Sequence, residues 1–277
     1  MIEIKRIEPT RSALRRFVKF QVDLYRDNEY FVPPLITDDM NTLDPRKNPA
    51  FDFCESAYFM AYDGGKPVGR VAGIINRQVN GRSGKKEVRF GFIDFVDDRE
   101  VSAALLAAVE QWGRDKGMTS IVGPLGFSDL DHEGTLIEGF EELSTMSTIY
   151  NYPYYAEHIE ALGYAKDSDW KEFVMDVPDG IPEKFNRIAE IVKKKFGLRV
   201  KKYTSRSKIK EEIGRPLFQL INEAYDGLYQ YSPLTDRQIE HYIKQYLSLL
   251  DLNLVTAIVD SEDNLVGVGI SMPSMSR

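Results

Sequence analysis

The feature that most constrains the fold is a hairpin pattern that occurs twice in the chain. Residues 56–76 read SAYFMAYDGGKPVGRVAGIIN, and residues 253–273 read NLVTAIVDSEDNLVGVGISMP. Each stretch holds an apolar strand, an aspartate, a turn, a Val-Gly pair and a second apolar strand with a further glycine. The matching residues are Val68-Gly69 with Gly73 and Val266-Gly267 with Gly269. The shared order indicates an internal repeat of strand, helical segment and hairpin.

A repeat of this kind predicts two domains, as does the length of 277 residues, at about 100–200 residues per domain. We place these domains at residues 1–179 and 180–277. Only the ten positions VGISMPSMSR follow the Val-Gly pair of the second hairpin. The second copy is therefore expected to be incomplete, and by analogy with the first copy roughly a hundred further residues would complete it.

Apolar periodicity predicts the elements of the first domain. Strands are expected at 2–7, 57–63, 67–76, 87–96 and 119–127, and helices at 10–26, 100–116 and 153–162. Thr10 and Ser12 offer caps for the first helix, and Pro153 suits the first position of the last one. Ile159 and Leu162 are expected to pack that last helix on the sheet.

Other stretches are read from composition and pattern. Residues 28–53, which are rich in Pro, Asn and Asp, are expected to form one long ordered loop. Residues 171–179 are expected to close the first domain. In the second domain we expect a strand at 197–205 and helices at 209–229 and 236–250, followed by the second hairpin.

Composition narrows the classes of function. The chain is 43% hydrophobic and 29% charged, as globular proteins are, and its net charge of -7 gives no electrostatic footprint for nucleic acid. Short basic runs at 82–86 and 193–195 are interpreted as solvated faces. The single cysteine, Cys54, excludes an intramolecular disulfide and a cysteine zinc site, and we interpret it as a buried thiol. The start MIEIKRIEP lacks the apolar core of a signal peptide and no 18-residue apolar run occurs, which predicts a cytoplasmic protein without a membrane span.

The segment FGFIDFVDDREVSAALLAAVEQWGRDKGMTSIVGP, residues 90–124, resembles the GNAT superfamily, the acyl-CoA N-acyltransferase fold. In that fold a strand ends, a turn opens a helix, and the helix leads through a glycine into the next strand. YAEHIEALGY at 155–164 resembles the closing helix of the same fold. GPLGFSDLDHEGTLIEGF, YNYPYYAEHIEALGY and KDSDW are similar to a group of uncharacterised bacterial GNAT-like proteins. The resemblance implies an α/β (α+β) fold in which a mixed, mostly antiparallel sheet is flanked by helices, here in a tandem repeat.

The resemblance also implies where coenzyme A would bind. Backbone N–H groups at a helix N-terminus hold its pyrophosphate, which corresponds here to Asp98, Arg99, Glu100, Val101 and Ser102. This turn departs from the family pattern because it contains no glycine. Its carboxylates, with that of Asp97, are expected to cap the helix and repel a pyrophosphate. A second departure is Ile159, which stands where the family often has the tyrosine that protonates the leaving thiol.

The loop after the predicted central strand carries a cluster of acids. Glu133 or His132 is a candidate for a general base or an amine-binding group, because the loop would lie beside the cofactor cleft. A metal site that adds Asp129 and Asp131 has suitable residue types, but the spacing matches no known loop, and we expect no metal. The alternative is a turn that caps the following segment.

Four tyrosines, Tyr150, Tyr152, Tyr154 and Tyr155, surround Asn151 and Pro153. We interpret Tyr150 and Tyr154 as candidate catalytic phenols, and Asn151 and Tyr155 as candidate substrate-binding residues. Packing of the helix on the sheet is the alternative for each tyrosine. Tyr150, Asn151, Tyr154, His132 and Glu133 are expected to converge where the strands part.

These observations predict an acyltransferase that moves an acyl group from acyl-CoA or acetyl-CoA to an amine. The acceptor could be a small amine, an amino sugar or a lipid base. The alternative is a non-catalytic, degenerate GNAT-like module that binds a ligand or a partner. The sequence leaves the acyl chain length and the oligomeric state open.

Overall fold

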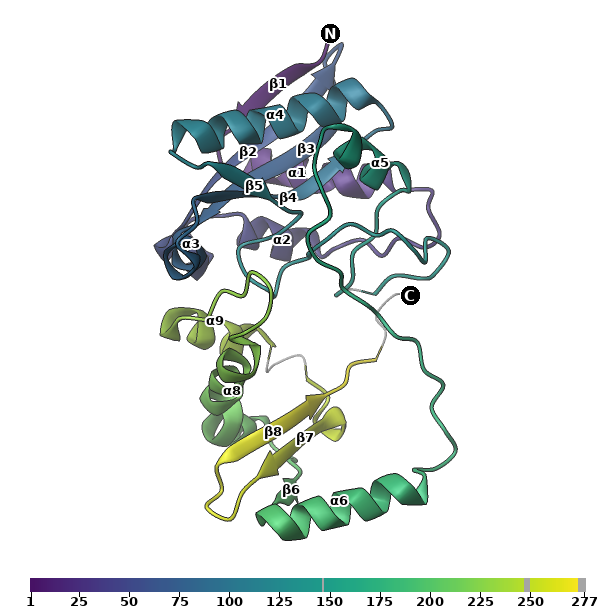
Figure 1. The fold of residues 1–277 in the computed structure, drawn as a ribbon, viewed down its shortest axis with the longest axis vertical. Coiled ribbons are helices and arrows are strands. Elements are labelled where there is room, and N and C mark those ends of the chain that lie inside the picture. Colours follow the sequence, from purple (N-terminus) through teal and green to yellow (C-terminus); the bar gives the residue numbers. More distant parts are fainter. Residues whose placement is uncertain (146, 247–249, 274–277) are drawn as a thin grey trace. The chain divides into compact units, whose positions relative to one another are not determined.

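The computed structural model describes residues 1–145, 147–246 and 250–273. Within these ranges the chain divides into two compact units (Figure 1). The first unit comprises Met1–Asp169 with the short segment Gln230–Ser232, and the second comprises Trp170–Tyr229 with Pro233–Pro273. The division falls before residues 171–179, which form no regular helix or strand, whereas the sequence placed the boundary after them.

A five-stranded sheet organises the first unit, with its strands in the order β1-β2-β3-β4-β5. Antiparallel pairing joins β1 to β2, β2 to β3 and β3 to β4, and β5 pairs parallel to β4. The strands are β1 (Glu3–Ile7), β2 (Cys54–Asp63), β3 (Lys66–Asn76), β4 (Glu87–Phe95) and β5 (Ser120–Val122). The predicted mixed, mostly antiparallel sheet is confirmed, although β5 is shorter than expected.

Helices cover both faces of this sheet because its strands are apolar on both sides. In β3, Val71 and Ile75 pack in the cluster that contains α4 (Arg99–Asp115), whereas Ala72 and Ile74 pack in the cluster that contains α1 (Arg11–Leu24). The period-2 alternation of a strand thus supplies two cores at once. The Thr10 hydroxyl accepts a hydrogen bond from the Ala13 N–H at 3.4 Å, as the predicted cap requires.

Short helices occur where none was predicted. The expected loop at 28–53 contains α2 (Ile36–Thr42) and the 3-10 helix η1 (Pro49–Asp52), and α3 (Arg77–Ser83) follows β3. The Asn48 side chain caps η1 and the Asn76 side chain caps α3, each by accepting a backbone N–H. The starts of η1 and α3 therefore rest on single side-chain caps, and an apolar-periodicity search does not detect helices this short.

The second unit repeats the opening half of the first. Its sheet has the order β6-β7-β8, with antiparallel pairs throughout. Helical segments separate β6 from the β7–β8 hairpin, as α1 and α2 separate β1 from the β2–β3 hairpin. This shared topology confirms the tandem repeat, and the second hairpin pairs with β6 in a sheet of its own. The elements are α6 (Glu183–Phe196), β6 (Arg199–Lys201), α7 (Arg206–Ile209), the π-helix η2 (Lys210–Gly214), α8 (Arg215–Tyr225), α9 (Asp236–Tyr246), the 3-10 helix η3 (Leu252–Leu254), β7 (Val255–Val259) and β8 (Leu265–Ile270).

Helix α6 was not predicted, and the helix expected over 236–250 is described as far as Tyr246. Residues 247–249 lie outside the described residues. Across the described parts of the chain, no helix is long and apolar enough to span a membrane.

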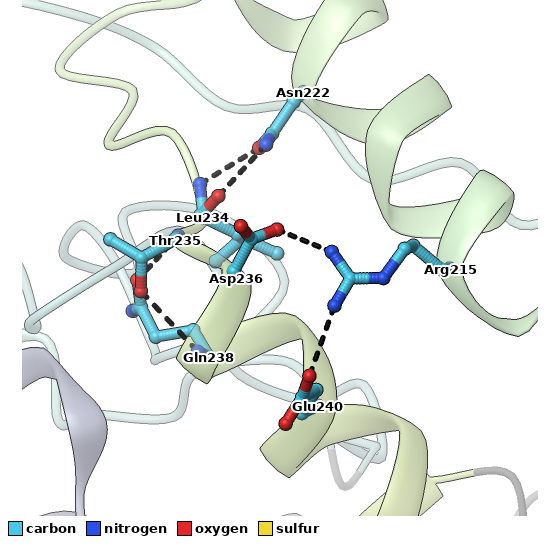
Figure 2. Close-up of polar contacts among 7 residues, drawn as sticks. All are labelled: Arg215, Asn222, Leu234, Thr235, Asp236, Gln238 and Glu240. Atoms are coloured by element: carbon cyan, nitrogen blue, oxygen red, sulfur yellow. Dashed lines mark hydrogen bonds and ion pairs between the residues drawn. The ribbon is translucent and has the colours of Figure 1, made fainter.

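Polar side chains fix the start of α9 against α8 (Figure 2). Thr235 and Gln238 form a capping box, in which the Gln238 N–H donates to the Thr235 hydroxyl at 3.3 Å and the Thr235 N–H donates to the Gln238 Oε1 at 3.0 Å. The Asn222 amide bonds both the N–H and the carbonyl of Leu234. The Arg215 guanidinium pairs with Asp236 and Glu240. The connection between the two helices is therefore held by side chains from both.

Replacing Thr235 with Ala should lower the free energy of unfolding of the second unit by about 1 kcal/mol, because the helix loses its N-cap acceptor. Thr235→Ser keeps a hydroxyl and serves as the matched control. Urea midpoints, followed by hydrogen exchange of α9 amides, measure the difference. Equal midpoints for the Ala and Ser variants would contradict the capping role.

Candidate functional site

The candidate site lies at the carboxyl end of β4, where the sheet opens. A bulge at Phe92, whose φ is +47°, shifts the β3–β4 register. Parallel pairing of β4 with β5 covers only Glu87–Arg89, and the Leu125 N–H then donates to the Phe90 carbonyl at 2.9 Å. A Cβ on Gly91 would collide with the Leu125 carbonyl, so glycine is needed for this approach. Beyond it the two strands separate.

The N–H groups of residues 100–102, in the first turn of α4, donate hydrogen bonds to Asp98 at the start of the same helix. The Asp98 carboxylate accepts the Glu100 N–H at 2.8 Å, and the Asp98 carbonyl accepts those of Val101 and Ser102 at 3.1 and 3.3 Å. The side chains of Val101 and Ser102 are buried. The predicted helix start and the predicted capping by Asp98 are confirmed, whereas the Asp97 carboxylate, also expected to cap the helix, contacts His158 instead. An incoming phosphate would meet satisfied N–H groups and the negative charge of Asp97, Asp98 and Glu100.

Helix α5 (Tyr154–Ala161) fastens onto this turn through His158. The imidazole is 3.0 Å from the Asp97 carboxylate through Nε2 and 3.0 Å from the Ser102 hydroxyl through Nδ1. The Ser102 hydroxyl also donates to the Arg99 carbonyl at 3.2 Å, and the imidazole tautomer sets which atom donates in each contact of His158. Ser102 is 1% exposed, so this trio is not a nucleophilic triad. It joins the start of α4 to α5.

The hydroxyl groups of two tyrosines form hydrogen bonds with backbone groups at the end of β4. The Tyr154 hydroxyl donates to the Phe95 carbonyl at 2.6 Å, and the Phe95 N–H donates to the Tyr155 hydroxyl at 3.2 Å. Their rings lie 5.8 and 4.3 Å from the Phe95 ring, measured between centroids. These contacts are made at the carboxyl end of β4. Here aromatic side chains of α5 cover it.

A buried ion pair supports the same strand end. The Arg70 guanidinium bonds the Asp94 carboxylate at 2.7 Å and the Phe17 carbonyl at 3.1 Å. The Tyr155 hydroxyl donates to Asp94 at 3.2 Å and accepts from the Tyr25 hydroxyl at 2.6 Å. Burial raises the pKa of Tyr155 well above the usual phenol value, so this hydroxyl keeps its proton. The network was not predicted, although its sequence signal was the presence of Arg70 and Asp94, with opposite charges, inside two neighbouring apolar strands.

Tyr150 and Asn151 brace the loop before α5. Both side chains are buried. The Tyr150 hydroxyl donates to the Phe140 carbonyl at 3.1 Å and accepts from the Asn28 amide at 2.9 Å. The Asn151 side chain bonds the Leu136 N–H and carbonyl at 2.6 and 3.1 Å. The side chains of both residues therefore form hydrogen bonds with other groups of the protein, and these bonds hold the loop in place.

The face that α5 buries differs from the predicted one. Tyr155 and His158 are its buried residues, Ile159 packs partly buried, and Leu162 is 40% exposed. The prediction for Leu162 was wrong because polar aromatic groups form the contact. Their hydroxyl and ring nitrogens find partners on β4 and α4, so burial costs them little.

Acidic residues of the loop after β5 form a second group around Arg89. The Asp131 carboxylate accepts the N–H groups of Phe127 and Ser128 at 2.7 and 3.1 Å, and Asp129 accepts that of Ser232 at 3.1 Å. Glu133 is half-buried, and burial, reinforced by Asp129 and opposed by Arg89, raises its pKa to about 8. His132 is exposed. The charges that act on Glu133 thus belong to this loop and to β4 rather than to the tyrosines.

No group of three or more His, Cys, Asp or Glu side chains placed to hold a metal ion occurs among the described residues. Cys54 is buried, and burial raises the pKa of its thiol to about 12, which leaves it unreactive. A hollow of about 390 Å³ opens beside α1 and α2 instead, with Arg11, Arg15, Arg46 and Lys47 among its lining residues. None of the predicted site residues lines it.

Known proteins are similar to this chain in sequence and in fold. No protein-family profile matches the sequence. The chain is 31% identical over 229 residues to Protein YghO of Escherichia coli (strain K12), covering 82% of this chain and 57% of that protein. It is 28% identical over 273 residues to the bacterial ceramide synthase of Caulobacter vibrioides (strain NA1000 / CB15N), covering 97% of this chain and 69% of that protein. The chain thus spans little more than half the length of YghO.

Among solved structures, the tandem GNAT protein from the clavulanic acid biosynthesis pathway matches with a TM-score of 0.50 and 15% identity. The match covers 99% of this chain and 76% of that one. At this identity the likeness shows the fold, which is a tandem GNAT fold.

Removing the acids that close α4 should expose its N–H groups to an anion. The variant Asp98→Gly with Glu100→Gly is expected to bind coenzyme A more tightly than the unaltered protein in calorimetry, since the repulsive charge and the side-chain cap are both lost. Glu110→Gly with Asp115→Gly, at the far end of the same helix, is the matched control. Tight binding by the unaltered protein, with phosphates on the N–H groups of this turn, would show that the turn does not exclude them.

Glu133 should make the protein less stable as the pH rises from about 5 to 8. A folded-state pKa of about 8 against an ordinary value of 4.5 means that the folded chain holds one more proton than the unfolded chain in this window, so unfolding free energy falls with increasing pH. Glu133→Gln should flatten that slope, and Glu138→Gln on the same loop should not. Urea midpoints across the window give the slopes. The same slope in Glu133→Gln and in the unaltered protein would contradict the raised pKa.

Proposed function

Because the chain has the fold of the GNAT N-acyltransferases, we propose that it acts in the transfer of an acyl group from an acyl-CoA thioester to an amine. The observation that carries this proposal is the tandem GNAT likeness, which extends over 99% of the chain and so includes both units. The relative that covers nearly all of the chain is a ceramide synthase, and a ceramide is the amide of a long-chain amino alcohol. We therefore favour a lipid-like amine as acceptor over a small amine or an amino sugar.

The reaction needs a group that takes a proton from the attacking nitrogen. As the amine nitrogen bonds to the acyl carbon, the C–S bond breaks, and the proton lost by nitrogen moves to the base while the thiolate leaves. We propose Glu133 as this base. A carboxylate with a pKa of about 8 accepts a proton near neutral pH far better than an ordinary carboxylate does.

The neighbourhood of Glu133 also suits a cationic acceptor. Asp129 and Asp131 add negative charge to the same loop, and burial raises the pKa of Asp131 to about 6. Among the described residues, Arg89 is the cation whose charge lowers the pKa of Glu133. An ammonium group bound here would relieve the repulsion among these carboxylates and lower their pKa values.

The donor is proposed to avoid the first turn of α4. Residues 97–102 do not fit a pyrophosphate, because Asp98 satisfies the N–H groups of the turn and the neighbouring acids repel phosphate. Tyr154 and Tyr155 cover the adjoining strand end. No step of the proposed reaction therefore depends on coenzyme A at this turn, and Tyr154 is proposed as a hydrogen-bond donor that holds α5 in place.

The same closure favours a second candidate function, a non-catalytic module that binds a ligand or a partner. Thermal unfolding with coenzyme A, acetyl-CoA and a long-chain acyl-CoA separates the two candidates. A ligand at a hundred times its dissociation constant adds about 2.7 kcal/mol of stability. If none of the three ligands raises the unfolding temperature of the intact protein, the non-catalytic module is favoured.

Activity is tested by thiol release from acetyl-CoA and palmitoyl-CoA in the presence of a long-chain amino alcohol. We expect kcat/KM to rise with pH to a plateau above about 8, because the base must be ionised. Glu133→Gln should lower kcat/KM by about a hundredfold or more, whereas Glu138→Gln should leave it unchanged. Full activity in Glu133→Gln would remove Glu133 from the mechanism. A higher rate with a hydrophilic amine than with the amino alcohol would overturn the acceptor class.

A further inference from the structure

Helix α6 presents an apolar face that no described part of its unit covers. Its large apolar residues on this face are Phe185, Ile188, Ile191, Val192 and Phe196, with exposures of 61%, 46%, 55%, 39% and 58%. At 3.6 residues per turn these five positions fall within an arc of about 140°. None of the residues of α6 is buried, and the core cluster of the second unit contains none of them. The sequence of α6 therefore produces an apolar face that is not part of the described core.

Cationic side chains accompany this face. By helical spacing, Lys193 lies beyond one edge of the apolar arc, whereas Lys184 and Lys195 lie between Ile188 and Ile191 near the other edge. Lys195 Nζ sits 5.1 Å from the centre of the Phe196 ring. The helix carries five cations against two acids, in a chain whose net charge is -7. The positive charge is thus concentrated where the apolar face is.

The segment that leads into α6 continues the exposed apolar surface. Phe173, Val174, Met175, Val177 and Ile181 are between 69% and 93% exposed. Isolated exposed apolar residues are ordinary, whereas five within the nine positions 173–181 add exposed apolar side chains to the segment that precedes the helix.

We propose that α6 lies in the interface of an anionic lipid bilayer, with its apolar face in the acyl region and its lysines at the headgroups. An amphipathic helix whose polar face is rich in lysine and whose other face carries phenylalanine is the kind of element that binds in this plane. Lysine stems extend along the apolar region while their ammonium groups reach the phosphates. A second copy of the chain is disfavoured as the occupant, because pairing two such faces would bring the lysines of both copies together. The inference goes beyond the proposed function, since it concerns the surface on which the protein works.

The intact protein is tested by flotation with vesicles of phosphatidylcholine alone and of phosphatidylcholine with phosphatidylglycerol. We expect binding to the anionic vesicles that weakens as salt is raised. Phe185→Ser with Val192→Ser should reduce the partition at least about tenfold, since two apolar side chains leave the bilayer. Leu35→Ser with Ile137→Ser, two exposed apolar residues of the first unit, is the matched control and should bind normally.

The charge contribution is tested by Lys184→Gln with Lys195→Gln. Each lysine near an anionic surface contributes to binding, so the pair should again lower binding at least about tenfold. Arg11→Gln with Arg15→Gln removes the same charge from exposed positions on α1 and should have no such effect. All variants change only exposed side chains, and circular dichroism confirms that they fold.

Three outcomes would overturn the proposal. One is the absence of vesicle binding by the intact protein, which would mean that other polypeptide covers the face. Another is binding that is equal for neutral and anionic vesicles and unchanged in the lysine variant. The third is a dimer in light scattering that Phe185→Ser with Val192→Ser dissociates, which would assign the face to a second copy.

Discussion

The buried ion pair between Arg70 and Asp94 is the interaction on which the first unit depends. Arg70 lies on β3 and Asp94 on β4, and both side chains are almost fully buried. Through Phe17 the pair reaches α1, and through Tyr155 it reaches α5. Loss of one partner would leave an uncompensated buried charge, at a cost of about 3–5 kcal/mol. Two strands and the helices on both faces of the sheet are thus fixed relative to one charge pair.

This arrangement explains why the end of β4 is closed. Asp94 draws the Tyr155 hydroxyl to the strand, which places Tyr154 over the Phe95 carbonyl and His158 against the first turn of α4. Each of these groups is hydrogen-bonded, so burying them costs little. A GNAT fold is therefore combined with a strand end and a helix end whose polar groups are already occupied.

The two copies of the repeat differ in what their helices cover. In the first unit α4 packs its apolar face on the sheet. In the second, α8 and α9 supply the described core, and α6 contributes nothing to it. An amphipathic helix outside the core has the same local pattern as one inside it, because the pattern fixes only which side chains share a face. What covers that face is a property of its surroundings.

The sequence by itself determined most of the elements that carry their own periodic pattern, and the exception is α6, which was not predicted. The hairpins, β1, α1 and the β4–α4 unit were all predictable, because period-2 and period-3.6 apolar spacing is local information. The repeat and the acid-capped turn at Asp98 were also readable, since both lie in contiguous residues. The short helices α2 and α3 were missed for want of a long pattern.

Only the tertiary structure decided the roles of the tyrosines. Tyr155 pairs with Tyr25 across 130 positions of sequence and with Asp94 across 61, and His158 reaches Asp97 across 61. Tyr154 bonds the Phe95 carbonyl at the strand end, and the charges that act on Glu133 are those of Asp129, Asp131 and Arg89. The convergence of Tyr154 and Glu133 stays a prediction. A phenol can line a pocket or pack against a sheet with the same local sequence. The choice depends on which polar groups distant segments bring within hydrogen-bonding distance, and that is settled only when the chain is folded.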